Sequence, residues 1–268
     1  MLPRWGFLAV AAILSLLGLT RAERPAPAVK DVQAKFIKAL GGVDAITRVR
    51  SMTMRGFGIA YEANGKHTRI PFVIYASDFK RLEVDTVPGK GNFSFGYDGK
   101  IAWALSPAGK AKVFTGTDAA SIRRDADLRY FAHIPAYFRS MTVVGVRSFY
   151  GHVCYLVRGI NLWGNVNNQY YDVASGLLTG YRFHQWIGGA PEKAETVQVF
   201  DRYQRFDGLL ISTRETDYRD GRPAGAMYYV SIRVNNVDPR VFKLPPAVTA
   251  LVKSKRSGGE SRRVFLRA

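Results

Sequence analysis

The residues of this chain that could do nucleophilic or metal chemistry are few and scattered. The four histidines, at positions 67, 133, 152 and 184, stand far apart, and none belongs to an H-E-x-x-H pair, so a metal site is not expected. The single cysteine, Cys154, lies two residues after His152 on a predicted strand, so the two side chains share a face and could form a thiolate–imidazole pair. No orienting partner is evident in the sequence. We therefore expect neither a catalytic dyad nor a cofactor.

Other motifs of catalysis are missing from the sequence as well. It contains no G-x-S-x-G elbow, no phosphate-binding loop and no G-x-G-x-x-G. The carboxylates number 21, and turn chemistry accounts for several of them, namely Asp98, Asp172, Asp207 and Asp220. An enzyme that acts on an envelope polymer would need a buried ionisable pair, and we find none in the sequence. The expectation is a protein that is not an enzyme.

The elements that would have to position any site are mostly short strands. Between residues 51 and 234, runs of β-branched and aromatic residues are separated by hairpin turns such as Asn64-Gly65 and Asp207-Gly208. This pattern predicts an antiparallel meander of about a dozen strands. Apolar residues at helical spacing predict a helix over 29–40, which ends at Gly41-Gly42, a short helical turn over 43–49 and a further helix over 117–131.

So few helices cannot cover both faces of so long a sheet. We therefore predict a mainly β (α+β) fold in which a strongly curved, unclosed antiparallel β-barrel has its concave side filled or capped by the helices. The apolar phase shifts at Gly56, which predicts a bulge there. Aromatic residues make up 13% of the chain. A curved sheet with so many of them and so few helices is expected to leave an apolar hollow that binds apolar ligands.

The two ends of the chain carry different signals. Residues 1–22 have Arg4 before an apolar run and small residues at the end, which predicts a cleaved signal peptide and export. A linker over 23–28, one domain over 29–250 and a basic flexible tail over 251–268 are expected to follow. Because the only cysteine is Cys154, no disulfide and no lipid anchor are expected.

Charge narrows the class of partner. The formal net charge is +18, and loss of Arg4 and Arg21 with the signal leaves 18 − 2 = +16. Such an excess favours an anionic partner, and for an exported protein an anionic membrane surface or an acidic polysaccharide is more abundant than nucleic acid. The alternative is that the positive charge serves only to keep the protein soluble.

Several short motifs resemble a known family. The segments 38–42 (KALGG), 51–56 (SMTMRG), 96–103 (GYDGKIAW), 206–211 (FDGLLI) and 242–245 (FKLP) are similar to those of the LolA-like superfamily of outer-membrane lipoprotein-sorting proteins. The resemblance spans roughly residues 29–246. It implies an unclosed barrel of about eleven strands, with two or three helices lidding a hydrophobic cavity for lipid or acyl chains, and a periplasmic location. Unlike the anchored members of that superfamily, this sequence lacks a lipidation cysteine.

Three functions remain open at this point. The first is a periplasmic binding and transfer protein for lipid or for the acyl chains of a lipoprotein, and the second is a regulatory protein that binds an envelope protein partner through the same fold. The third is the enzyme considered above. For the cavity of the first, alternation on predicted strands selects eight candidate lining residues, although one register slip would reverse every choice. They are Phe57, Ile59, Phe72, Ile74, Trp103, Leu156, Tyr181 and Phe183.

Overall fold

A computed structural model of the 268-residue chain describes residues 26–62, 64–187 and 190–254. The predicted signal peptide and most of the predicted basic tail therefore lie outside the described residues, while residues 246–254 are helical. The other helices are α1 (Val29–Leu40), α2 (Gly42–Arg48), α3 (Gly116–Asp125) and α4 (Tyr130–His133), with 3₁₀ turns η1 (Ile134–Tyr137) and η2 (Pro239–Phe242). No helix in these ranges is both long enough and apolar enough to cross a membrane.

The strands follow one another along most of the chain. The first six are β1 (Ser51–Tyr61), β2 (His67–Ser77), β3 (Lys80–Val87), β4 (Gly91–Tyr97), β5 (Ala102–Leu105) and β6 (Ala111–Val113). After α3 and α4 come β7 (Phe138–Phe149), β8 (His152–Asn161), β9 (Val166–Asp172), β10 (Leu178–Ile187) and β11 (Ala190–Asp201). The last are β12 (Gln204–Phe206), β13 (Leu209–Ile211), β14 (Arg214–Arg219) and β15 (Arg222–Val234).

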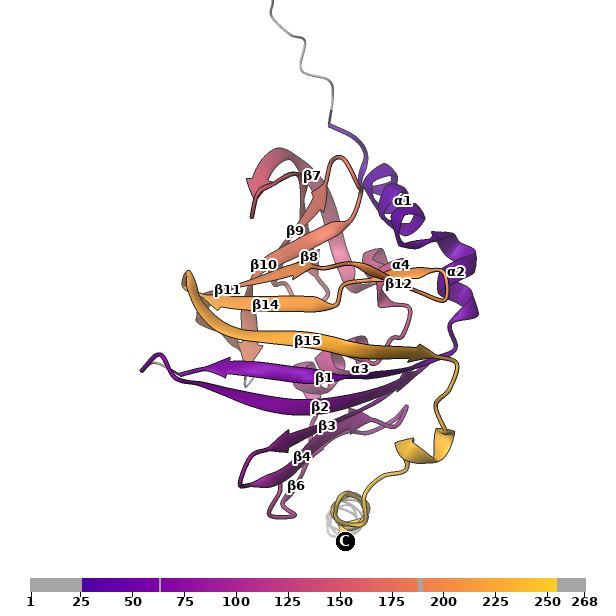
Figure 1. The fold of residues 1–268 in the computed structure, drawn as a ribbon, viewed down its shortest axis with the longest axis vertical. Coiled ribbons are helices and arrows are strands. Elements are labelled where there is room, and N and C mark those ends of the chain that lie inside the picture. The colour runs from indigo at the N-terminus through magenta and orange to yellow at the C-terminus, as the bar shows by residue number, and fades with distance from the viewer. Residues whose placement is uncertain (1–25, 63, 188–189, 255–268) are drawn as a thin grey trace, which may run out of the picture.

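In the described ranges, 13 of these strands form one antiparallel sheet in the order β6-β5-β4-β3-β2-β1-β15-β14-β11-β10-β9-β8-β7. The chain runs outward from β1 to the edge strand β6, crosses by way of α3 and α4 to the far edge β7, and then returns strand by strand until β15 pairs with β1. The sheet is strongly curved and not closed, because β6 and β7 remain its edges (Figure 1). This is the predicted fold class, with two strands more than the eleven that the resemblance implies.

Irregular pairing marks the places where the sheet bends. The predicted bulge is confirmed, since the register between β1 and β15 shifts between Arg55 and Gly56. A Cβ atom on Gly56 would lie 1.9 Å from the carbonyl oxygen of Tyr228, so only glycine lets the two strands approach so closely. Further shifts occur within β7, β10 and β14. Such bulges raise the local twist and allow the sheet to curl.

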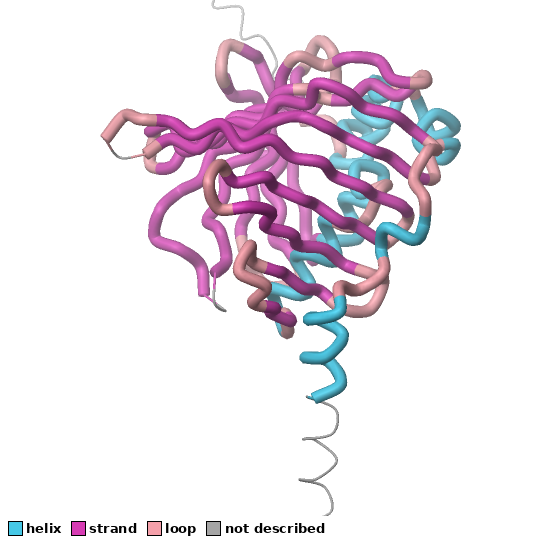
Figure 2. Tube along the Cα trace, turned by 60° about the horizontal axis from the view of Figure 1, so that its bottom comes forward, coloured by secondary structure: helices cyan, strands magenta, loops and turns pink. Residues whose placement is uncertain are grey.

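The helix α1 covers one face of the sheet. Its side chains Val32, Phe36 and Leu40 recur at helical spacing and are buried in the same cluster as Tyr171 of β9 and Leu178 of β10. The helix α3 contacts β4 and β5 as well as β10, so it reaches across the concave side between two distant parts of the sheet. Figure 2 shows most of the helices gathered along one side of the strands, with the helix of residues 246–254 projecting below them. We call this side the helix-covered face.

The helix predicted over 117–131 is interrupted in the structure. Asp127 is only 6% exposed, and its carboxylate accepts hydrogen bonds from the backbone N–H of Arg129 (3.0 Å) and from the hydroxyl of Tyr137 (2.7 Å). A short acidic side chain that binds the backbone two residues further on competes with the helical hydrogen bonds. The segment therefore forms α3 and, after a turn, the single-turn helix α4.

Candidate functional site

The eight residues selected from the sequence do not share one face of the sheet. Four of them lie on the helix-covered face. Tyr181 belongs to the buried cluster under α1, and Phe183 packs against it. Ile74 pairs with Met54, which packs in the cluster around Met52 and Ile232, and Phe72 shares the face of Ile74 because it is two residues away on the same strand. Trp103 alternates with Ala102, which packs against α3, and Leu156 alternates with the core residue Val157. Both therefore point to the opposite face. The same holds for Phe57 and Ile59, because their partners on β2 alternate with Phe72.

A cleft opens on the helix-covered face between β1, β2, β14 and β15. Its volume is about 220 Å³, and we call it the interior cleft. Ile70, Phe72 and Met227 give it an apolar wall, and the backbone around Ile59 borders it. Glu83, Asp85 and Asp217 supply the polar part of the lining. An apolar wall with a few converging polar groups is the usual composition of a small-molecule site.

The three carboxylates of this cleft, and Glu215 beside it, come from two strands with the same local pattern. Glu83 and Asp85 are two residues apart on β3, and Glu215 and Asp217 are two residues apart on β14. Because side chains alternate along a strand, each pair points to one face. The partners of Glu83 and Asp85 on β2 are Ile74 and Phe72, and the partner of Glu215 on β11 is Phe200 of the core under α1. All four carboxylates therefore lie on the helix-covered face.

Burial makes three of these carboxylates, Asp85, Glu215 and Asp217, harder to ionise. It raises the pKa of Glu215 to about 7, against a hydrogen bond from the hydroxyl of Tyr229 (3.1 Å), and the nearby charges of Asp217 and Glu83 add to the increase. Burial and the charge of Glu83 raise the pKa of Asp85 to about 6, and burial also raises that of Asp217. Asp85 and Glu215 can therefore hold a proton near neutral pH and donate it in a hydrogen bond to a polar ligand group.

One cation stands beside these acids. Arg81 of β3 forms an ion pair with Glu83 at 2.6 Å, and both side chains are largely buried. Glu83 is thus engaged by Arg81, whereas Oδ1 of Asp217 is buried without a hydrogen-bond partner among the described residues. The interior cleft thus offers an apolar wall together with unsatisfied hydrogen-bonding capacity. In the described ranges, no group of three or more His, Cys, Asp or Glu side chains is arranged to hold a metal ion.

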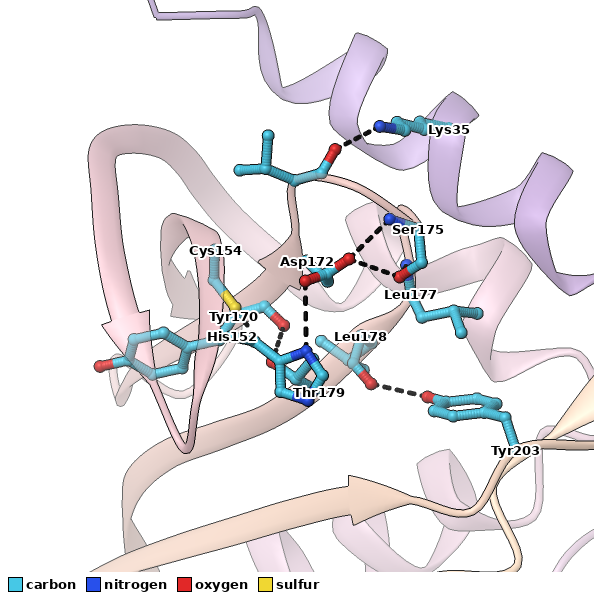
Figure 3. Close-up of polar contacts among 11 residues, drawn as sticks. Lys35, His152, Cys154, Tyr170, Asp172, Ser175, Leu177, Leu178, Thr179 and Tyr203 are labelled. Carbon is cyan, nitrogen blue, oxygen red and sulfur yellow. Dashed lines mark hydrogen bonds and ion pairs between the residues drawn. The ribbon is translucent and has the colours of Figure 1, made fainter.

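The residues with potential nucleophilic chemistry lie elsewhere and are engaged with other partners. His152 Nδ1 lies 3.2 Å from Asp172 Oδ2, and the Sγ of Cys154 lies 3.3 Å from the hydroxyl of Thr179, as Figure 3 shows. Burial raises the pKa of the Cys154 thiol, which is 0% exposed. A buried, protonated thiol is a poor nucleophile. The geometry therefore provides no thiolate–imidazole pair between His152 and Cys154.

The two main helices differ in how firmly they hold the sheet. In α1 the side chains of Val32, Phe36 and Leu40 are all fully buried. The ten residues of α3, all of them described, include none that is fully buried, and its sequence carries Asp118, Arg123, Arg124 and Asp125. The helix that crosses the concave side therefore buries little apolar area and can be displaced at lower cost than α1.

Comparison with known proteins identifies the fold. No protein-family model matches the chain, and no curated protein is significantly similar to it in sequence. Among solved structures, a LolA superfamily protein from Nitrosomonas europaea superposes with a TM-score of 0.58 at 8% identity, covering 82% of this chain and 99% of that one. A DUF1329 family protein from Desulfovibrio piger gives a TM-score of 0.59 at 13% identity, with 80% and 97% covered.

A third solved structure extends the same likeness. A putative outer membrane lipoprotein-sorting protein domain from Vibrio parahaemolyticus superposes with a TM-score of 0.54 at 11% identity, covering 80% of this chain and 94% of that one. At such identities the likeness shows the fold alone. The fold is LolA-like, as the sequence motifs indicate.

Proposed function

We propose that this chain, with its LolA-like fold, is an exported, non-catalytic carrier that binds a lipid, or the acyl chains of a lipoprotein, on the helix-covered face of its sheet. The observation that supports this best is the interior cleft, in which an apolar wall of Ile70, Phe72 and Met227 adjoins Asp85 and Asp217, whose pKa values are both raised by burial, that of Asp85 to about 6. An amphiphilic ligand matches both parts. Its acyl chain packs on the wall, and its polar group accepts hydrogen bonds from protonated carboxyls.

Movement of α3 is the step that makes room for a whole acyl chain. The cleft as it stands holds about 220 Å³, which is below the usual range for a drug-sized ligand of roughly 300 Å³ or more. Since α3 lies across the concave side without a fully buried residue, its displacement opens the space between β4 and β10. The firmly packed α1 remains as the fixed wall. Loading and release then follow from the equilibrium between the closed and open positions of α3.

The free energy of acyl transfer explains why such a carrier is needed. Burial of one methylene is worth about 0.8 kcal/mol, so two chains with about 30 methylenes would cost on the order of 20 kcal/mol to expose to water. A sheltered apolar face removes most of this cost. The net charge, +16 without the predicted signal peptide (18 − 2), holds the protein close to anionic lipid head groups during loading and delivery. The periplasm is the compartment that fits this function and the predicted signal peptide.

Substitution of Ile70 by lysine should weaken acyl binding strongly while the protein stays folded. Ile70 lies in the wall of the interior cleft, and a lysine there can pair with the neighbouring carboxylates. With a fluorescent fatty acid as the probe, we expect Ile70→Lys to weaken binding by at least about tenfold. Val230→Lys is the matched control, because Val230 lies on β15 with 72% of its surface exposed and should not affect the probe. Equal binding by the two variants would place the ligand elsewhere.

A protein partner is the second candidate, and one feature of the sheet favours it. The edge strand β7 is 12 residues long and carries the exposed side chains Val144 and Val146. An edge of this kind can accept a strand from another protein. Two features limit such pairing, however. The strand has a bulge between Val143 and Gly145, and it carries Arg139 and Arg147. Binding of an envelope protein that persists in Ile70→Lys would favour this candidate.

A further inference from the structure

A second cleft lies on the face of the sheet opposite the interior cleft. Its volume is about 380 Å³, and β11, β14 and β15 form its floor. Val199 pairs with Thr216, and both alternate with Phe200 and Glu215, which face the core under α1. The cleft is therefore separated from the interior cleft by the thickness of the sheet. We call it the outer cleft.

Tyrosine rings surround the outer cleft. Tyr61 ends β1, Tyr150 occupies the turn between β7 and β8, Tyr218 belongs to β14 and Tyr228 to β15. The rings of Tyr150 and Tyr218 are 5.2 Å apart, and Tyr228 stacks on Phe57 at 4.9 Å. Among the described residues, the hydroxyls of Tyr61, Tyr150 and Tyr218 have no hydrogen-bond partner. These rings offer apolar faces together with free donors and acceptors.

The charged groups in the outer cleft neutralise one another. The guanidinium of Arg214 binds the carboxylate of Asp201 through two nitrogens, one of them at 2.6 Å, and His152 contacts Asp172. A free cation would be repelled by the net charge, which is +16 without the predicted signal peptide (18 − 2), while a free anion would find Arg214 already paired. The cleft therefore suits an uncharged ligand rich in hydroxyl groups.

The turn that carries Tyr150 has an unfavourable residue at its bend. Tyr150 has φ 44° and is followed by Gly151 with φ 85°. The same backbone is formed by Asp207-Gly208, at 48° and 85°, and by Asp220-Gly221, at 48° and 76°. Aspartate tolerates this left-handed conformation, whereas a bulky side chain there is strained. A tyrosine in place of an aspartate puts a ring over the cleft at a cost to the turn, and strained residues of this kind gather at functional sites.

We propose that the outer cleft binds a saccharide. Sugar rings stack their C–H faces on Tyr150 and Tyr218, and their hydroxyls exchange hydrogen bonds with the free phenol groups and with the Asp201–Arg214 pair. The site is independent of the lipid carrier function, since it lies on the other face of the sheet. A carrier with both sites could hold a glycan of the cell envelope while its acyl ligand is loaded or released.

The test is titration of the full chain with two uncharged probes, maltotetraose and the tetramer of N-acetylglucosamine, followed by nuclear magnetic resonance of the protein. We expect saturable binding of at least one probe, with shifts centred on β14 and the Tyr150 turn. Tyr218→Ala and Tyr150→Asp should each weaken it by at least about tenfold. Tyr150→Asp should fold well, because aspartate already occupies this position in two other turns. Val153→Asp, on the same hairpin and 59% exposed, should bind as the unchanged protein does.

Two outcomes would overturn the saccharide site. One is the absence of binding of either probe to the unchanged protein, or equal affinity in Tyr218→Ala. The other is binding of phosphatidylglycerol vesicles, without binding of either sugar, that is lost in Tyr150→Asp, since this would assign the tyrosines to a membrane surface. In either case, Tyr150→Asp should bind the fluorescent fatty acid as tightly as the unchanged protein does. Failure of the saccharide site and failure of the carrier function are therefore distinguishable.

Discussion

Replacing Phe36 by alanine is expected to destabilise the protein by ~3–5 kcal/mol, the cost usual for removing a buried phenylalanine. The side chain is 1% exposed and packs edge-on against Tyr171 of β9 at 5.4 Å and against Phe131 of α4 at 5.8 Å. It therefore joins α1 both to the sheet and to the segment that follows α3. Because a domain of this kind has a total stability of about 5–15 kcal/mol, the loss would be a large fraction of the whole.

Urea denaturation measures this loss directly from the midpoint and slope of unfolding. The matched control is Val43→Ala on α2, where 61% of the side chain is exposed and a change within about 0.5 kcal/mol is expected. A loss of stability below about 1 kcal/mol in Phe36→Ala would show that α1 is not the fixed wall of the concave side. It would also contradict the claim that α1 is held more firmly than α3.

Replacing Glu215 by glutamine is expected to stabilise the protein at pH 8 and to have little effect at pH 4. The pKa of Glu215 rises from 4.5 to about 7 on folding, so between these values the folded protein keeps a proton that the unfolded chain has released. Stability therefore falls as pH increases through this window and stays low above it. At 1.36 kcal/mol for each pKa unit, the gain in Glu215→Gln at pH 8 is at most about 3 kcal/mol.

Glutamine keeps an oxygen that accepts the hydrogen bond from Tyr229, so the variant removes the charge with little change in shape. Thermal unfolding between pH 4 and pH 8 compares it with the unchanged protein and with Glu62→Gln at an exposed loop position. Because the pKa of Asp85 is also raised, part of the pH dependence of stability remains in all three proteins. If the curve of stability against pH for Glu215→Gln ran parallel to that of the unchanged protein, folding would not raise the pKa of Glu215.

Local signals in the sequence were sufficient for much of the fold. The helix over 29–40 is predicted at its observed bounds, because a full amphipathic pattern precedes a glycine pair that accepts positive φ, and Gly41 has φ 126°. The bulge at Gly56 is likewise visible as a shift of apolar phase. The break at Asp127 is not visible, because the buried position that lets its carboxylate bind the backbone of Arg129 is also held by the hydroxyl of Tyr137, ten positions away, which only the folded chain brings near.

The candidate site was less predictable, and register explains why. Alternation shows which residues of a strand share a face, but it does not show which face the helices cover. The lining predicted from the sequence therefore divides between both faces. The acidic residues in and beside the interior cleft carry a signal that is visible in the sequence. Glu83 with Asp85 and Glu215 with Asp217 are carboxylates two residues apart within strands, a spacing that puts each pair on one face.

The measurement that tests the account most directly is mass spectrometry of organic extracts from the purified protein, compared with Ile70→Lys. We expect the unchanged protein to carry about one acyl-bearing lipid or lipoprotein per chain, and a folded Ile70→Lys to have lost it, because the lysine occupies the apolar wall of the interior cleft. An extract without lipid, even after the protein has been incubated with envelope lipids, would contradict the carrier function and would favour a protein partner instead.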